Sequence, residues 1–315
     1  TLMRSSAASD VYKRQIYACI SAGTFGMIPL FANTAMREGV NNDTILVYRY
    51  VIAALVYGVY LAFRNISLKI NRETLIELLW AGVGGYGITA YFLFLSYRYM
   101  PTGIATSIHY LYPVVVAVFM SLFYKQHLSI RVKGAIVLAI LGVYFMSWSD
   151  GEIKWAGLIF ALLTTFTYGT YIVALNRPHL KALNADALTF YVLAFTALFY
   201  LLTAGLRRNL VLNFTPHFLF DMSMLGILST VISARLLVAA VERIGSVATS
   251  VLGTLEPITA IIIGVFAFQE ELGIKNFVGL LLVLIAVLIV ILSMNERHKK
   301  KQRQIFNRQF DARRK

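Results

Sequence analysis

Charged side chains are scarce in this 315-residue chain, and cysteine is almost absent. Only 14% of the residues are charged and 58% are hydrophobic, against about 25% and roughly 45–50% in soluble domains. A soluble core of this size cannot hide so much apolar surface, so we expect lipid to cover part of it. The single cysteine, Cys19, lies in an apolar stretch, which excludes an intrachain disulfide and a cysteine-rich metal site.

Motifs of cofactor and catalytic sites are also missing. The sequence has no Walker-type phosphate loop, no His-Glu-x-x-His and no nucleophile elbow, so we expect no cofactor, no resident metal and no catalytic residue. The run Gly82–Gly87 fits the letters of the dinucleotide-binding motif. That motif needs a preceding strand and an exposed helix start, whereas this run interrupts a long apolar segment. We interpret it as a place of close helix packing or as a hinge.

Long apolar stretches fill most of the chain. Each is about 18–24 residues long, and a helix needs about 20 to cross the hydrocarbon core of a bilayer. The ten-residue alternating segments of a membrane barrel are missing. We therefore predict an all-α membrane protein with ten transmembrane helices. The expected spans are 16–36, 43–63, 74–97, 102–124, 131–148, 155–175, 185–205, 217–241, 246–268 and 275–294.

A shift of 143 residues aligns the second half of the chain with the first. It matches Ala105-Thr106-Ser107 with Ala248-Thr249-Ser250, and one inserted residue later Pro113 with Pro257. Five helices per copy is an odd number, so the second copy enters the membrane from the opposite side. We predict a 5+5 inverted-topology repeat, which is typical of transporters with a site near mid-membrane. Further matches at the same shift are Ile16/Ile159, Ala18/Ala161, Thr24/Thr167, Gly26/Gly169, Asn33/Asn176, Asn41/Asn184, Asp43/Asp186, Tyr48/Tyr191 and Tyr57/Tyr200.

The net charge of +14 is concentrated after the last span. Nine of the 29 Lys and Arg residues lie between Arg297 and Lys315, and such a cluster beside a span is typical of a cytoplasmic segment facing anionic lipid. We therefore expect no nucleic-acid partner and a multi-pass protein of a bacterial inner membrane with both termini in the cytoplasm. Residues 5–15 (SSAASDVYKRQ) resemble translated adapter sequence. The predicted divisions are a non-native leader (1–15), two repeats (16–148 and 155–294) and a basic tail (295–315).

Paired motifs recur in the two halves of the chain. They are Phe25-Gly26, Tyr168-Gly169, Pro113…Tyr124-Lys125-Gln126-His127-Leu128 and Leu255-Glu256-Pro257…Gln269-Glu270-Glu271-Leu272. The chain from Ile16 to Met294 resembles the EamA-type branch of the drug/metabolite transporter superfamily. The resemblance implies that small metabolites such as amino acids are exported or taken up through a cavity between the repeats. His127 stands where the second half has Glu271, so a role for that acid is in doubt in the first half.

Ionisable residues deep in the spans are the main candidates for a site, because each costs about 3 kcal/mol to insert. Glu256 lies about ten residues, or roughly 15 Å, into its span. It is predicted to exchange protons or to bind a substrate amine; the alternative is a neutral or hydrogen-bonded carboxyl. Arg235, in the preceding helix, is predicted to bind a carboxylate or phosphate. The alternatives for Arg235 are snorkelling to the surface and a salt bridge to Glu256.

Three further residues are predicted to face the substrate. His109 and Tyr112 precede Pro113, whose kink exposes a carbonyl. His109 can carry a proton, although a hydrogen-bonded packing role is the more common one. Tyr168 is a candidate cavity aromatic. Arg49, flanked by two tyrosines, is interpreted as an anchor at the membrane interface rather than as a transport residue.

Together these features predict a secondary transporter or facilitator that works by alternating access. Its substrate is expected to be an amino acid or a related small solute, moved outward, with protons as the coupling ion that Glu256 would exchange. Two other hypotheses remain: an intramembrane enzyme acting on a lipid, and a non-transporting receptor or scaffold. The enzyme would need clustered His or acidic residues at one depth. The receptor would not need the repeat.

Overall fold

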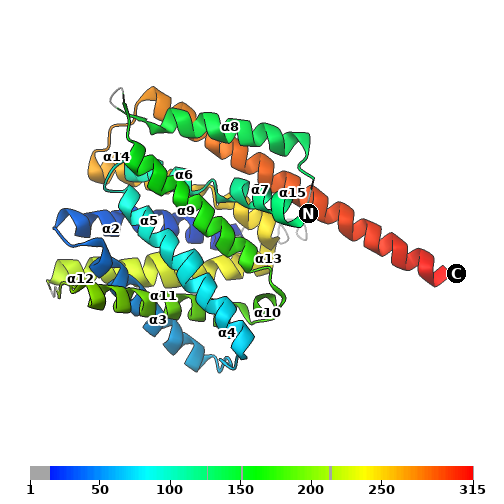
Figure 1. Ribbon diagram of the computed structural model, residues 1–315, viewed down its shortest axis with the longest axis horizontal. Coiled ribbons are helices and arrows are strands. Elements are labelled where there is room, and N and C mark those ends of the chain that lie inside the picture. The colour runs from blue at the N-terminus through cyan, green and yellow to red at the C-terminus, as the bar shows by residue number, and fades with distance from the viewer. Residues whose placement is uncertain (1–14, 126, 150–151, 213–214, 315) are drawn as a thin grey trace, which may run out of the picture.

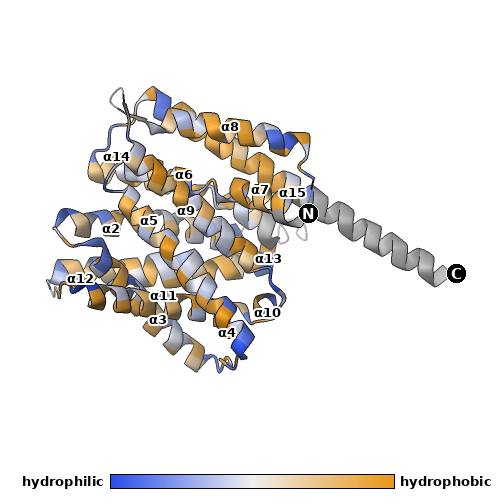
Figure 2. Ribbon diagram, viewed as in Figure 1, coloured by the Kyte–Doolittle hydropathy of each residue, from blue (hydrophilic) through white to orange (hydrophobic). Residues whose placement is uncertain are grey.

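The computed structural model describes residues 15–125, 127–149, 152–212 and 215–314. Within them, ten helices are long and apolar enough to cross a membrane, and they form one bundle from which α15 (Ile274–Arg314) extends (Figure 1). Apolar residues dominate the helices, and polar residues gather at places such as the start of α4 (Arg72–Leu79) (Figure 2). The chain is therefore a multi-pass helical membrane protein.

Each predicted span corresponds to an observed one, and several spans are divided into segments. The first span is helical over 15–26 and continues as α2 (Ile28–Arg37). A two-residue strand pair, β1 (Trp148–Ser149) with β2 (Glu152–Ile153), lies between the repeats. The rest of the first repeat is α3 (Asn42–Phe63), α4, η1 (Trp80–Gly87), α5 (Ile88–Ser96), α6 (Thr102–His109), α7 (Tyr112–Tyr124) and α8 (Ile130–Ser147); the second is α9 (Trp155–Ala174), α10 (Pro178–Lys181), α11 (Ala185–Arg207), α12 (Pro216–Ser223), η2 (Met224–Ile232), α13 (Ser233–Leu252), α14 (Leu255–Phe268) and α15.

Asparagine side chains begin three of the helices. The Oδ1 atom of Asn41 accepts a hydrogen bond from the backbone N–H of Thr44 at 2.8 Å, and Asn184 accepts one from Asp186 at 2.9 Å. Asn71 caps α4 in the same way. The first N–H groups of a helix have no intrahelical acceptor. These caps therefore satisfy the helix ends near the membrane surface.

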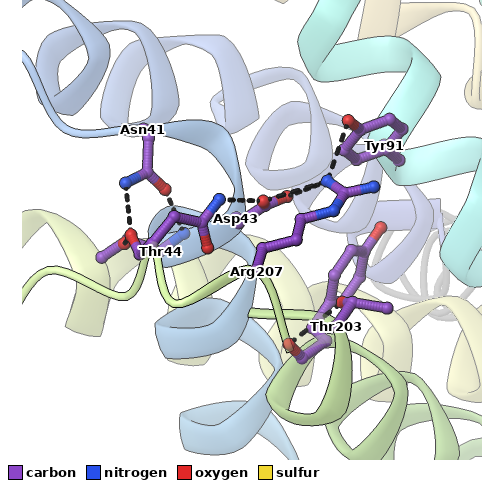
Figure 3. A network of polar contacts seen from close by, with 8 residues as sticks. Asn41, Asp43, Thr44, Tyr91, Thr203 and Arg207 are labelled. Atoms are coloured by element: carbon purple, nitrogen blue, oxygen red, sulfur yellow. Dashed lines mark hydrogen bonds and ion pairs between the residues drawn. The ribbon is translucent and has the colours of Figure 1, made fainter. Parts of the chain in front are cut away.

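The two repeats run in opposite directions, as α3 and α11 show. At one end of this pair, Arg207 Nη1 lies 3.1 Å from Asp43 Oδ2, so the end of α11 meets the start of α3 (Figure 3). At the other end, the Tyr57 hydroxyl donates to Asp186 Oδ1 at 2.9 Å. The shift of 143 residues equates Asp43 with Asp186. Helices equated by the repeat are thus antiparallel neighbours.

Two more equated pairs have the same arrangement. Thr102 N, at the start of α6, donates to Glu270 Oε1 just beyond α14 at 2.8 Å. Asn276 Nδ2, near the start of α15, donates to the carbonyl of Met146 near the end of α8 at 2.9 Å. An inverted repeat requires this antiparallel pairing, so the predicted 5+5 inverted topology is confirmed.

A π-helical segment occupies the same place in each repeat. η1 lies in the third span and η2 in the eighth. A Cβ added at Gly82 in η1 would lie 3.0 Å from the Val192 carbonyl oxygen, and one added at Gly226 in η2 would lie 3.1 Å from the Arg49 carbonyl oxygen. The close helix packing predicted for the glycine run is therefore confirmed, and it recurs in the second repeat.

The structure describes only part of the predicted leader (1–15) and of the predicted basic tail (295–315). The predicted leader lies outside the described residues except for Gln15, which is already helical. The basic tail continues the last span as helix α15 through Arg314. The side chains from Arg297 onward lie outside the described part.

Candidate functional site

A cavity of about 230 Å³ lies between the two repeats and is lined by polar and aromatic side chains. It reaches mid-membrane, because Arg49 is the eighth residue of the span Asn42–Phe63 and Glu256 the ninth of the span Ala248–Phe268. Both repeats contribute to its walls. The polar and aromatic lining comprises Ser21, Phe25, Arg49, Tyr50, Tyr86, Thr89, His109, Tyr110 and Tyr112 from the first repeat and Tyr168, Thr249, Ser250 and Glu256 from the second.

Arg49 provides a fixed positive charge in this cavity. Its side chain is held across the repeat interface, because Nε donates to Thr230 Oγ1 in η2 at 3.0 Å. The guanidinium carbon lies 5.0 Å from the ring centre of Tyr50 and 5.7 Å from that of Phe94. Arg49 is only 3% exposed. Among the described residues no carboxylate forms an ion pair with it, so its charge is available to a ligand.

The interpretation of Arg49 as an interfacial anchor is wrong. An anchor would direct its guanidinium to the headgroup region, whereas Arg49 is buried and lines the cavity. The reason is its depth: the eighth residue of a helix lies about 10 Å beyond the first. The position of Arg49 within its span therefore indicates its burial better than the flanking tyrosines do.

Glu256 lies in the first turn of α14, directly before Pro257. A turn at Gly253 and Thr254 separates α13 from α14, and the side chain then enters the cavity. None of the hydrogen bonds within the described residues uses the Glu256 carboxylate. Glu256 and Arg49 thus line the same cavity.

Gly26 allows the first span to approach Glu256 closely. A Cβ at Gly26 would lie 2.5 Å from the Glu256 carbonyl oxygen and 2.6 Å from Thr259 Cβ. In the other repeat, a Cβ at Gly169 would lie 3.0 Å from Val115 Cγ1. The aromatic-glycine pairs found in the sequence thus mark the two contacts that bring the first helix of each repeat against the other repeat.

His109, Tyr112 and Tyr168 form one aromatic cluster on the cavity wall. The ring centres of Tyr112 and Tyr168 are 4.7 Å apart, and those of His109 and Tyr168 are 5.2 Å apart. His109 Nδ1 also hydrogen-bonds with Thr164 Oγ1 at 3.0 Å. The structure thus brings these three predicted site residues together with Glu256, in agreement with a shared cavity.

Arg235 does not line this cavity, which corrects its expected position. Leu237 and Val241 of the same helix do so, and a helix turns 100° per residue, so Arg235 faces elsewhere. Its Nε lies 3.3 Å from Asp186 Oδ1 and donates to the Tyr60 hydroxyl at 3.0 Å. The partner of Arg235 is therefore Asp186 and not Glu256. Asp186, at the start of α11, thus holds the Arg235 side chain near one end of the α3–α11 pair.

Sequence reasoning missed two cavity tyrosines as well as Arg49. Tyr86 lies inside the glycine run that was interpreted only as packing or hinge, and Tyr50 follows Arg49. Their ring centres are 5.9 Å apart, and that of Tyr86 lies 6.4 Å from that of Tyr168. A tyrosine hydroxyl within a span needs a polar partner. This requirement could have indicated from the sequence that Tyr50 and Tyr86 face a polar cavity.

Ten spans in two inverted repeats around a polar cavity are the architecture of a membrane transporter. Residues 13–148 and 155–292 each match the EamA-like transporter family, and the chain belongs to that family.

Known proteins of similar sequence are also transporters. An uncharacterized transporter of Archaeoglobus fulgidus is 24% identical over 273 residues, which cover 83% of this chain and 93% of that protein. GDP-fucose transporter 1 of Dictyostelium discoideum is 25% identical over 168 residues, or 51% of this chain and 45% of that protein. A crystal structure matches 90% of this chain and 98% of its own with a TM-score of 0.64 at 15% identity, which supports the fold alone.

Proposed function

We propose that the protein moves a small zwitterionic metabolite, of the amino-acid class, across the membrane by alternating access. The observation that carries this proposal is the placement of Arg49 and Glu256 in one cavity between the repeats. Arg49 would bind the substrate carboxylate, because a guanidinium matches a carboxylate with two parallel hydrogen bonds. Glu256 would face the ammonium group.

The cavity's size supports a small substrate. At about 230 Å³ it is smaller than the roughly 300–1,000 Å³ of pockets for drug-sized ligands. A nucleotide sugar, as in the name of the Dictyostelium relative, would need more room. The aromatic cluster of His109, Tyr112 and Tyr168 offers ring faces to the carbon skeleton and hydroxyl groups for hydrogen bonds.

Glu256 is also our candidate for coupling transport to protons. The Glu256 carboxylate can pair with the substrate ammonium group or take up a proton, but not both at once. Substrate binding and proton binding would therefore be coupled at this residue. His109 lies on the same wall, in the aromatic cluster with Tyr112 and Tyr168. We propose export as the direction.

We further propose that the protein lies in a bacterial inner membrane with both termini in the cytoplasm and performs no catalysis of its own. The basic tail favours this orientation, since positively charged segments are retained on the cytoplasmic side. Reporter fusions after Ser149 and at the C-terminus test it. Opposite signals are expected from these two places, because five spans separate them; equal signals would contradict the topology.

A thermal-shift comparison of matched ligands tests the substrate class. Purified protein in detergent is heated with an amino acid, with the amine that lacks its carboxylate, and with the acid that lacks its ammonium group. A ligand that binds the folded state raises the melting temperature by mass action. We expect the amino acid to stabilise most and both analogues to lose stabilisation. Equal shifts from the amine and the amino acid would refute the role of Arg49.

A further inference from the structure

A second cluster of ionisable side chains lies at the membrane face where the first span ends. Glu38 follows α2 directly, and His217 and Asp221 lie one turn apart on α12. α2 and α12 are close together at the same end of the bundle (Figure 1). Glu38 belongs to the first repeat and the other two residues to the second, so the cluster bridges the repeats.

The ligand atoms of the three side chains converge on one place. Glu38 Oε1 is 2.7 Å from His217 Nδ1, and Asp221 Oδ2 is 3.6 Å from the same nitrogen. All three atoms lie within 4.8 Å of one another. Four ligands arranged tetrahedrally around Zn²⁺ at about 2.0–2.2 Å are about 3.3–3.6 Å apart. The observed separations range from 2.7 Å to at most 4.8 Å. Side-chain movements of about 1 Å would therefore bring the three atoms to the tetrahedral spacing.

Asp221 gives independent support for a cation here. It is only 5% exposed, and its Oδ2 atom has no hydrogen-bond partner among the described residues. A buried carboxylate without a partner is costly. His217 offsets that charge only when it is protonated, whereas a divalent cation would offset both carboxylates. The neighbouring Arg37 is engaged elsewhere, since its Nη2 donates to the Phe268 carbonyl at 3.2 Å.

The chemistry of the donors selects the kind of ion. One imidazole nitrogen and two carboxylate oxygens form a mixed set that suits Zn²⁺ and similar transition metals, with a fourth position left for water. The exposed side chains of Glu38 and His217 provide access from the aqueous side.

A similar group elsewhere lacks this geometry and provides a control. His179 contacts Glu73 through Nε2 at 3.2 Å and Glu77 through Nδ1 at 3.4 Å. The two nitrogens point away from opposite edges of the ring, so one ion cannot bind both. His179 therefore bridges two carboxylates, whereas His217 directs a single nitrogen at both of its acidic neighbours.

We propose that Glu38, His217 and Asp221 form a Zn²⁺-type metal site that joins the two repeats at this face. Resting on the transport function proposed above, a bound ion hinders the relative movement of the repeats and lowers the transport rate. The ion thus acts as an inhibitory regulator, separate from the substrate cavity.

Metal binding to the full chain tests the site without reference to transport. Purified, tag-free protein in detergent is dialysed against Zn²⁺, and bound metal is measured by mass spectrometry. We expect about one Zn²⁺ per chain, and at least about tenfold weaker binding in E38Q, H217A and D221N. H179A should bind as the unaltered protein does. Because Glu38 is partly exposed, E38Q is expected to fold normally, which a melting curve without metal checks.

Transport in liposomes tests the inhibitory effect. Zn²⁺ should slow the unaltered protein and leave E38Q unaffected. No binding to the unaltered protein, or binding to E38Q and H217A that is as tight as to the unaltered protein, would overturn the site. Binding that does not change the transport rate would overturn the inhibitory role. Substitutions at Arg49 or Glu256 should retain zinc binding, so a failure of the transport proposal is distinguishable from a failure of this one.

Discussion

Replacing Arg49 by Gln removes the fixed charge from the cavity and keeps a side chain that can still donate to Thr230. A hydrogen bond to a charged group contributes about 1.5–3 kcal/mol, and 1.4 kcal/mol corresponds to a tenfold change in affinity. We therefore expect a substrate carboxylate to bind about 10- to 150-fold more weakly to this variant.

The same substitution should cost the protein little stability. Arg49 is 3% exposed, and its one hydrogen bond to a described residue is to Thr230. A buried cation without a carboxylate partner is a burden on the fold, which is tolerated where function needs it. We expect the melting temperature of Arg49→Gln without ligand to be equal to that of the unaltered protein or higher.

Two measurements on purified protein check these expectations: ligand affinity by titration calorimetry, and melting in detergent. Arg235→Gln is the matched control, because Arg235 pairs with Asp186 outside the cavity. It should lower the melting temperature and leave the affinity within about twofold. If Arg49→Gln bound the ligand as tightly as before, or if it melted far below the control, the reasoning about a free charge in the cavity would be refuted.

Three more substitutions have clear expected outcomes. Glu256→Gln should abolish the pH dependence of transport in liposomes while the protein still folds; an unchanged pH profile would remove Glu256 from the coupling step. Gly103→Ala should destabilise the protein by about 1–3 kcal/mol through overpacking, because the added Cβ would lie 2.7 Å from the backbone of α14. Gly23→Ala is the control and should not destabilise, because a Cβ there would have no neighbour within 4 Å. Equal melting temperatures for the two variants would contradict the packing. Asp186→Asn should lower the melting temperature, and in a double-mutant cycle with Arg235→Gln the two losses should add up to more than the double variant loses; strict additivity would mean that the pair contributes nothing.

The sequence was sufficient to predict the fold because its main signals are local. Span length sets the number of helices, and the match of Asp43 with Asp186 at a constant shift indicates the duplication. The odd number of spans per copy then determines the inverted topology. The breaks before Pro113 and Pro257 were also predictable, because proline cannot supply the hydrogen bond that a continuous helix needs.

The candidate site was only partly predictable, because the direction in which a side chain points depends on the packing of other helices. Glu256 was found through its depth, and His109 and Tyr112 through the neighbouring Pro113, whereas Tyr168 was named only as an aromatic of the sixth span. Arg235 was misplaced because the sequence does not reveal that Asp186, 49 residues earlier, lies beside it. The π-helical segments change the facing of the residues that follow them, and an ideal helical repeat does not anticipate that change.

The two repeats have similar backbones but contribute different charges to the cavity. Close glycine contacts recur at Gly82 and Gly226, which lie one residue apart in the alignment of the repeats. The same alignment equates Arg49 with Val192 and Glu256 with Tyr112. Alternating access needs two halves that can exchange conformations, which favours a symmetric backbone.

A single substrate with distinct ends needs each charge only once. A symmetric pair of arginines would bind a dianion, and a symmetric pair of glutamates a dication. One Arg49 and one Glu256 in the same cavity instead match a molecule that carries one charge of each sign. Placing a second arginine at Val192, the position equated with Arg49, should therefore shift preference from amino acids toward dicarboxylates. Competition between an amino acid and a dicarboxylate for binding to Val192→Arg measures this shift, and an unchanged preference would count against the complementarity of charge.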